Sequence, residues 1–245
     1  MPLRDEQDAY GRLLLEAFEG RDVTEVVERD DGYLMASAAG APANYFASFP
    51  RWPAHQRRAM RSVRGRVLDV GCGAGRVALH LQQRRQDVVA IDASPLAVEL
   101  SRRRGVSDAR VLSITQVDRS LGAFDTIVMM GNNFGLFGSA PRTKTLLRRF
   151  RSVTSDRGRI VAEVLDPYAT DDPDHLAYHV RNRQRGRMSG QARIRIRHRH
   201  YTTPWFDYLF VSQAELENLV DGTGWSLQRT VPSAGPLYIA VLERS

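Results

Sequence analysis

The sequence holds one cysteine and one lysine in 245 residues, and no apolar run of about 18 residues. Cys72 alone cannot form an intramolecular disulfide, and a cysteine-rich metal site is excluded. The histidines are scattered without ligand spacing, so no metal is expected. The first ten residues, MPLRDEQDAY, lack the apolar core of a secretory signal. We therefore expect a cytoplasmic protein with no membrane span.

The charge is unbalanced in an unusual way. Lys144 is the only lysine among 35 basic residues, so the net charge of +7 comes almost wholly from arginine. Such a charge favours an anionic partner. One-sided use of arginine can also follow from genome composition, so the charge by itself identifies no partner.

Residues 66–165 alternate between short apolar runs and helical patterns. Strands that alternate with helices of about 10–15 residues predict βαβ units and a parallel sheet, hence an α/β protein. Two further strand candidates, 226–231 and 237–242, follow a helix that begins at Ser212, with Glu215 completing a capping box. The five strands expected in the alternating region are 66–70, 87–94, 109–114, 124–131 and 158–165.

The two flanking regions differ from this pattern. Residues 6–19 and 53–62 have helical character, so we expect a helical N-terminal cap over 1–64, ahead of a main domain at 65–245. Residues 166–190 are polar and aromatic without a clear period. Residues 191–201 then alternate as a strand does, with Arg193–Arg199 on one face. We predict a substrate lid at about 166–210.

The central motif is VLDVGCGAGR, residues 67–76. A glycine turn after a buried strand lets the backbone approach a ligand, and the next helix points its N–H groups at the same spot. Asp69 before the turn would repel a pyrophosphate, which disfavours a dinucleotide such as NAD and suits a cationic amino acid group instead. Asp92 ends the following strand, where a carboxylate can accept both hydroxyls of a ribose.

This stretch resembles motif I and the following acidic loop of class I S-adenosylmethionine-dependent methyltransferases. The resemblance covers 66–164 and extends to the last two strands. It implies a Rossmann-like, doubly wound, mostly parallel seven-stranded sheet with helices on both faces and one antiparallel strand near the C-terminus. The cofactor-binding residues it implies are Asp69 at the amino end of the methionine, Gly71, Cys72 through its backbone, Gly73 and Gly75 along it, and Asp92 with Ala93 at the ribose.

The adenine end of the family pattern is altered. Many members carry an acidic residue after the third strand, whereas this chain has SITQVD. We expect Ile114 to cover the adenine face, and Gln116 or a backbone carbonyl to meet the adenine amino group. Asp118 is a possible substitute.

The fourth strand leads into GNNFGLFG, residues 131–138. Ligands of open α/β sheets bind at the carboxyl ends of the strands. We expect Asn132 to bind the cofactor and Asn133 to orient the acceptor; the alternative is a turn stabilised by asparagine. The family's nucleobase- and glutamine-modifying members often carry Asn- or Asp-Pro-Pro-aromatic here, and its absence argues against amino methylation of nucleobases.

Aromatic residues of the lid and the N-terminal region are candidates for the acceptor pocket. If the acceptor is a hydroxyl, a base helps, and His175 is the first candidate, followed by His179 or Asp166. Ordinary packing is the alternative role for the aromatic residues. The candidates for substrate binding are Tyr45, Tyr168, Tyr178, Trp205, Phe206 and Tyr208.

The sequence thus predicts S-adenosylmethionine-dependent methyl transfer to an oxygen or nitrogen of a small molecule. One alternative is an RNA or protein methyltransferase that uses the Arg193–Arg199 face for an anionic partner. Another is a protein that binds the cofactor without catalysis. Nucleic acid is a possible partner but not the favoured one, and the sequence does not indicate an oligomeric state.

Overall fold

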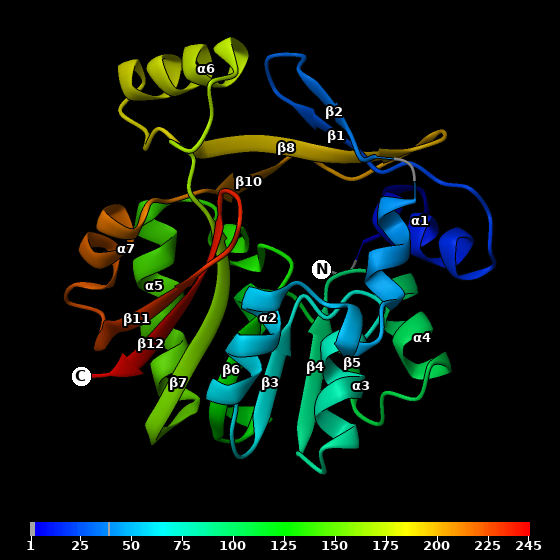
Figure 1. The fold of residues 1–245 in the computed structure, drawn as a ribbon, viewed down its shortest axis with the longest axis vertical. Coiled ribbons are helices and arrows are strands. Elements are labelled where there is room, and N and C mark those ends of the chain that lie inside the picture. Colours follow the sequence, from blue (N-terminus) through cyan, green and yellow to red (C-terminus); the bar gives the residue numbers. More distant parts are fainter. Residues whose placement is uncertain (1–2, 39) are drawn as a thin grey trace.

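The computed structural model describes residues 3–38 and 40–245. A seven-stranded sheet forms its lower part, and a smaller five-stranded sheet lies across one end of those strands (Figure 1). None of the helices in the described ranges is long and apolar enough to cross a membrane.

The large sheet has the strand order β11-β12-β7-β6-β3-β4-β5. Neighbours from β7 to β5 pair in parallel, and β12 runs antiparallel between β7 and β11. This topology confirms the fold class, including the antiparallel strand near the C-terminus. The strands are β3 (Val67–Val70), β4 (Val88–Asp92), β5 (Ala109–Val111), β6 (Phe124–Met129), β7 (Thr154–Leu165), β11 (Trp225–Pro232) and β12 (Leu237–Arg244).

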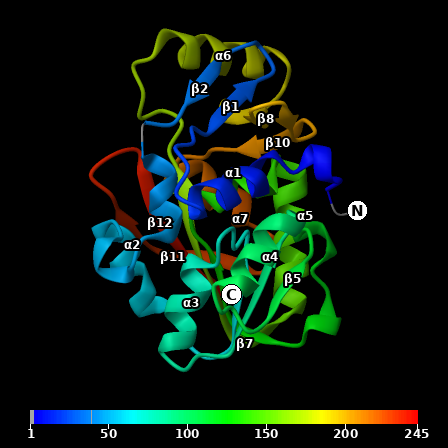
Figure 2. The same cartoon turned by 90° about the vertical axis from the view of Figure 1, so that its right-hand side faces the viewer.

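Helices cover both faces of this sheet because its strands are apolar on both sides. In β3, for example, Leu68 packs with the cluster that holds Phe150, whereas Val67 packs with the cluster that holds Leu81. Figure 2 shows α2 and α3 on one side of the sheet and α5 on the other. The helices are α2 (Ala54–Ala59), α3 (Arg76–Gln83), α4 (Pro95–Arg103), α5 (Ala140–Ser152) and α7 (Gln213–Val220), and the capping box of Ser212 and Glu215 at α7 is present.

The small sheet joins two distant parts of the chain. Its order is β10-β8-β1-β2, with β9 also on β8, and all pairs are antiparallel. We call it the cap sheet. Its strands are β1 (Val26–Arg29), β2 (Leu34–Ala36), β8 (Gln191–His198), β9 (Tyr201–Thr202) and β10 (Phe206–Leu209).

The expected helical character of residues 1–64 is therefore incomplete. The region contains α1 (Ala9–Phe18) and α2, but also the β1–β2 hairpin, which the sequence did not reveal because these strands are only four and three residues long. β1 takes its second partner, β8, from beyond β7. The strand expected over 191–201 also ends early: Arg199 has φ 53° and turns the chain into β9.

Helix α6 (Pro173–Gln184) forms in the segment that lacked a period. Asp172 caps it by accepting hydrogen bonds from the backbone N–H groups of Asp174 and His175. The helix buries only Tyr178, His179 and Asn182, so it needs no regular apolar stripe, and the sequence showed none. The 3₁₀ turns are Asp5–Gln7, Ala41–Phe46, Phe49–Arg51, Met60–Ser62, Ile114–Gln116, Arg119–Leu121 and Asn133–Phe137.

Candidate active site

The loop between β3 and α3 presents bare backbone at the carboxyl end of the sheet. Gly71 and Gly73 have φ of 73° and 53°, in the left-handed region that favours glycine. A Cβ at Gly71 would overlap Nδ2 of Asn133, and one at Gly73 would lie 3.1 Å from the hydroxyl of Tyr10. A side chain at Gly71 would thus collide with Asn133, and one at Gly73 would crowd Tyr10, so both positions favour glycine.

Two carboxylates flank this loop. Asp69 is 2% exposed, and burial, reinforced by the charge of Asp92, raises its pKa to about 7. Its Oδ2 atom is buried and has no hydrogen-bond partner among the described residues. Asp92 accepts hydrogen bonds from the N–H groups of Gly73 and Ser94, both at 2.9 Å, while burial raises its pKa. The unpartnered oxygen of Asp69 fits a cationic ligand group such as an ammonium.

The loop after β6 completes this end of the site. Asn133 donates from Nδ2 to the carbonyls of Val70 (3.1 Å) and Gly71 (2.8 Å), so it braces the glycine loop. Asn132 has φ 62°, and its carbonyl accepts a 2.6 Å hydrogen bond from the hydroxyl of Tyr208. Oδ1 of Asn132 is buried without a hydrogen-bond partner among the described residues. The side chain of Asn132 is thus available to a ligand.

Glu163 of β7 holds this loop in place, a role that the sequence did not predict. The side chain is 1% exposed and accepts hydrogen bonds from the N–H groups of Gly131 (2.8 Å) and Asn132 (3.1 Å). His55 and Gln56 of α2 contact the same carboxylate, at 2.6 and 2.8 Å. Burial raises the pKa of Glu163, but these hydrogen bonds outweigh it and the pKa is lowered. The sequence offered one sign of this role: Glu163 is the single acidic residue in the apolar run IVAEVL, residues 160–165.

A cavity of about 740 Å³ extends from these loops to the cap sheet. The inner face of the cap sheet forms its roof and is mainly apolar. Alternation along β8 separates this face from the arginines on the outside. Arg195 and Arg197 contact Glu28 at 2.8 and 3.0 Å, and Arg193 lies 3.4 Å from Asp207. The roof residues are Val27, Ala192, Ile194, Ile196, Phe206 and Tyr208.

Most residues predicted from the sequence line this cavity together. Tyr178 is buried in the roof and donates a 2.7 Å hydrogen bond to Asp30. The predicted residues that line the cavity are Asp69, Gly71, Cys72, Gly73, Asp92, Ala93, Ile114, Asn132, Asn133, Tyr45, Asp166, His175, Tyr178, His179, Phe206 and Tyr208.

Five predicted residues are not among those that line the cavity. Asp118, the possible substitute at the adenine, accepts a 2.8 Å hydrogen bond from the N–H of Ser120. Gly75 allows close packing, since a Cβ there would lie 2.6 Å from Val106. Gln116 turns back and accepts a hydrogen bond from the N–H of Ser113 at 3.0 Å. Tyr168 is 48% exposed and bonds Glu215, whereas Trp205 lies beneath the guanidinium of Arg195. Tyr168 and Trp205 contact other residues of the protein instead of the cavity, and the spacing of residues along the chain could not predict these contacts.

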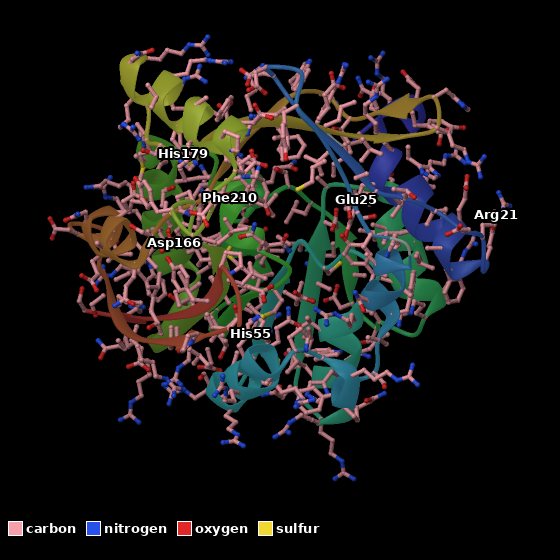
Figure 3. The ribbon with its side chains drawn as sticks, turned by 45° about the horizontal axis from the view of Figure 1, so that its top comes forward. Arg21, Glu25, His55, Asp166, His179 and Phe210 are labelled. Carbon is pink, nitrogen blue, oxygen red and sulfur yellow. The ribbon has the colours of Figure 1, made fainter. Side chains whose placement is uncertain are left out.

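The candidate bases from the lid lie at one end of the cavity. Nδ1 of His175 is 3.3 Å from Oγ1 of Thr170, and its ring packs against Tyr33. Asp166 accepts a 2.9 Å hydrogen bond from the N–H of Tyr168. Burial lowers the pKa of His179. Figure 3 shows Asp166 and His179 on one side of the molecule's centre and Glu25 on the other.

Tyr10 and Glu25 of the N-terminal region and Arg76 of α3 also line the cavity, and the sequence suggested none of them. Glu25 accepts a 2.7 Å hydrogen bond from the hydroxyl of Tyr45, and burial raises its pKa. Burial lowers the pKa of Arg76, the first residue of α3. The only local hint was the alternation of Glu25, Val27 and Arg29, too short to assign.

Comparisons with known proteins agree with this geometry. Residues 67–158 match the family model of a methyltransferase domain. A stretch of 69 residues is 38% identical to magnesium-protoporphyrin O-methyltransferase of Rhodobacter capsulatus; this covers 26% of the chain and 31% of the relative. The chain thus spans about a third of that relative's length.

Solved structures extend the likeness to the whole fold. A methyltransferase from Bacteroides fragilis, in complex with S-adenosyl-L-homocysteine, aligns with a TM-score of 0.83 at 24% identity, over 100% of this chain and 98% of that one. The 1,6-didemethyltoxoflavin-N1-methyltransferase of Burkholderia thailandensis aligns with a TM-score of 0.50 at 18% identity, over 79% of each chain. Residues 67–158 thus resemble a methyltransferase domain, and the whole chain shares the fold of a solved S-adenosylmethionine-dependent methyltransferase.

Proposed function

We propose that this protein transfers a methyl group from S-adenosylmethionine to an oxygen or nitrogen of a small molecule. One observation carries the proposal: a single cavity is lined both by the glycine loop with Asp92 and by the apolar roof of the cap sheet. Its volume of about 740 Å³ lies within the usual range for small-molecule sites. Such a cavity can hold a nucleoside cofactor and a compact acceptor together.

The cofactor supplies an activated methyl group, and the protein binds and orients it. We assign Asp69 to the ammonium group of the methionine portion, Gly71 and Gly73 to its close approach, and Asp92 to the ribose. Ala93, Ile114, Asn132 and the backbone of Cys72 fit the remaining contacts. Asn133, which we expected to orient the acceptor, supports the cofactor loop in addition.

The cap sheet fits the role of a lid over the acceptor. Excluding water favours methyl transfer, because the charge on the sulfonium is dispersed in the transition state. Tyr45, Tyr178, Phe206 and Tyr208 are our candidates for contacts with the acceptor. The structure of the relative from Burkholderia thailandensis holds bound 1,6-didemethyltoxoflavin and S-adenosylhomocysteine, which supports a small-molecule acceptor here. With Cys72 the sole cysteine, we also propose a cytoplasmic location.

The alternative of an RNA or protein acceptor depends on the arginine-rich strand. Glu28 and Asp207 already compensate Arg193, Arg195 and Arg197, and Arg199 contacts Glu16. Paired guanidinium groups attract a polyanion less strongly than free ones. These ion pairs favour a structural role for the arginines.

The proposal can be tested in two steps. Titration calorimetry should first show binding of S-adenosylhomocysteine. Release of S-adenosylhomocysteine from S-adenosylmethionine should then be measured with a panel of phenols, catechols and aromatic amines, and separately with RNA and with protein extract. Turnover with a small molecule supports the proposal. Turnover confined to RNA or protein, with retention on RNA that is lost in salt, would contradict it.

A further inference from the structure

We propose that Glu25 is the group that takes the proton from the acceptor, which is an otherwise apolar molecule with one hydroxyl or amine at the reacting position. This inference rests on the proposed function and deepens it. It replaces the lid residues as the first candidate for the base.

The position of Glu25 follows from strand alternation. Glu25, Val27 and Arg29 share the inner face of the cap sheet, and all three line the cavity. Oε2 of Glu25 accepts the 2.7 Å hydrogen bond from Tyr45. In the described ranges, Oε1 accepts no hydrogen bond, and the atom is not among the fully buried ones. Tyr45 therefore fixes the carboxylate while one oxygen stays open to the cavity.

Glu25 directly precedes β1, and within the described residues its carboxylate lacks a counter-ion, unlike the charged residues of that strand. Glu28 contacts Arg195 and Arg197, and Arg29 contacts Asp31. Within the described part of the chain, only the Tyr45 hydroxyl offsets the effect of burial on Glu25, and its pKa is raised. A desolvated carboxylate without a counter-ion is a stronger base than an ion-paired one.

The charged and titratable groups around Glu25 place it beside the reacting centre. Tyr45, which donates to Glu25, packs edge-on against Tyr10 of α1 with ring centroids 5.7 Å apart. The charge of Glu25 adds to burial in raising the pKa values of Tyr10, of Tyr45 from the 3₁₀ turn at 41–46 and of Tyr208 from β10. Tyr10 lies over Gly73, and Tyr208 bonds the carbonyl of Asn132. Glu25 thus lies near both loops that bound the cofactor site.

The remaining charges at this end act on the tyrosines rather than on Glu25. Asp92 adds to the rise in the pKa of Tyr10. Burial lowers the pKa of Arg76, and the charges of Glu163, Asp69, Tyr10 and Tyr45 offset part of that effect. His175, by contrast, contacts Thr170 and Tyr33. Figure 3 shows Glu25 apart from the lid residues Asp166 and His179.

The step balances without any further reactant. The acceptor oxygen or nitrogen forms a bond to the methyl carbon, and the carbon–sulfur bond breaks with its electron pair left on sulfur. The acceptor's proton passes to Oε1 of Glu25 and leaves with solvent after the products depart. The carboxylate must be ionised at the start, so turnover should rise with pH through its pKa.

The test compares Glu25→Gln and Glu25→Asp with Glu28→Gln, a matched control on the outer face of β1. With a small acceptor that the wild type methylates, Glu25→Gln should lower kcat by about 10²–10⁴-fold. It should also abolish the rise of kcat with pH and leave the Kd of S-adenosylhomocysteine within about twofold. Glu25→Asp should recover part of the rate, and Glu28→Gln should match the wild type.

A second measurement needs no acceptor. The infrared difference between wild type and Glu25→Gln should contain one carboxyl group that titrates above the ordinary value of 4.5. Titration at or below 4.5, or a Glu25→Gln variant that keeps its turnover and pH dependence, overturns the inference alone. A wild type that binds S-adenosylhomocysteine but methylates no small molecule overturns the proposed function, and the inference with it.

Discussion

Replacing Asp92 tests the centre of the cofactor site, because this carboxylate has two separable roles. Within the protein it accepts hydrogen bonds from the N–H groups of Gly73 and Ser94. Toward the cofactor it is placed to accept the ribose hydroxyls. Asp92→Ala leaves both N–H groups without this acceptor, and an unpaired donor costs about 1–3 kcal/mol. Removing a carboxylate whose pKa burial has raised offsets part of that cost.

We therefore expect Asp92→Ala to lower the free energy of unfolding by about 2 kcal/mol, measured by urea denaturation. The affinity for S-adenosylhomocysteine should fall by about 1–3 kcal/mol, or roughly 5- to 150-fold in Kd by calorimetry. Asp87→Asn is the matched control. Asp87 lies just before the other end of β4 and is largely exposed, and its side chain contacts only Arg66 in the described structure, so both quantities should stay near those of the wild type.

The two measurements separate the two roles. A loss of stability with unchanged affinity would show that Asp92 only braces the glycine loop, and the ribose placement would be wrong. A loss of affinity without a loss of stability would show that the two internal hydrogen bonds contribute little. Unchanged values in both would refute the reasoning altogether.

Three further predictions follow from the same contacts. Asn133→Ala removes the two hydrogen bonds that brace the glycine loop, so both turnover and the affinity for S-adenosylhomocysteine should fall, by steady-state kinetics and calorimetry. A fall in turnover alone would indicate that Asn133 acts mainly on the acceptor. The pKa of Asp69 is raised to about 7, and the ammonium group of the ligand favours the ionised form of this carboxylate. The affinity for S-adenosylhomocysteine should therefore rise from about pH 6 to about pH 7.5 with release of a proton, and Asp69→Asn should remove this pH dependence. Ile194→Asn places a polar group in the apolar roof and should raise the KM for the acceptor about tenfold, whereas Arg195→Gln on the outer face should not; equal effects would place the acceptor elsewhere.

Local sequence was sufficient for the cofactor half of the molecule. The strand before Gly71, the turn itself and the strand that ends at Asp92 lie within about 25 residues, and their pairing is that of neighbouring βαβ units. β3 and β4 are buried on both faces, α3 has a regular apolar stripe and α4 is capped by Ser94, so period and composition agree with the fold. Capping by Ser212 and Glu215 was readable for the same reason.

The acceptor half depended on contacts between distant segments. The alternation over 191–198 predicted two faces, yet only pairing with β1 decided that Ile194 and Ile196 look inward while Arg195 and Arg197 meet Glu28. Glu25 became a cavity residue through the same pairing.

Sequence by itself determined the parallel sheet, the glycine turn and the carboxylates beside it, because short-range patterns specify strands, helices and turns. Tertiary structure alone decided the cap sheet, the burial of Glu25 and which face of β8 forms the roof. The physical reason is that a strand's period gives two faces without saying which is buried, and that choice is made by a partner more than 150 residues away.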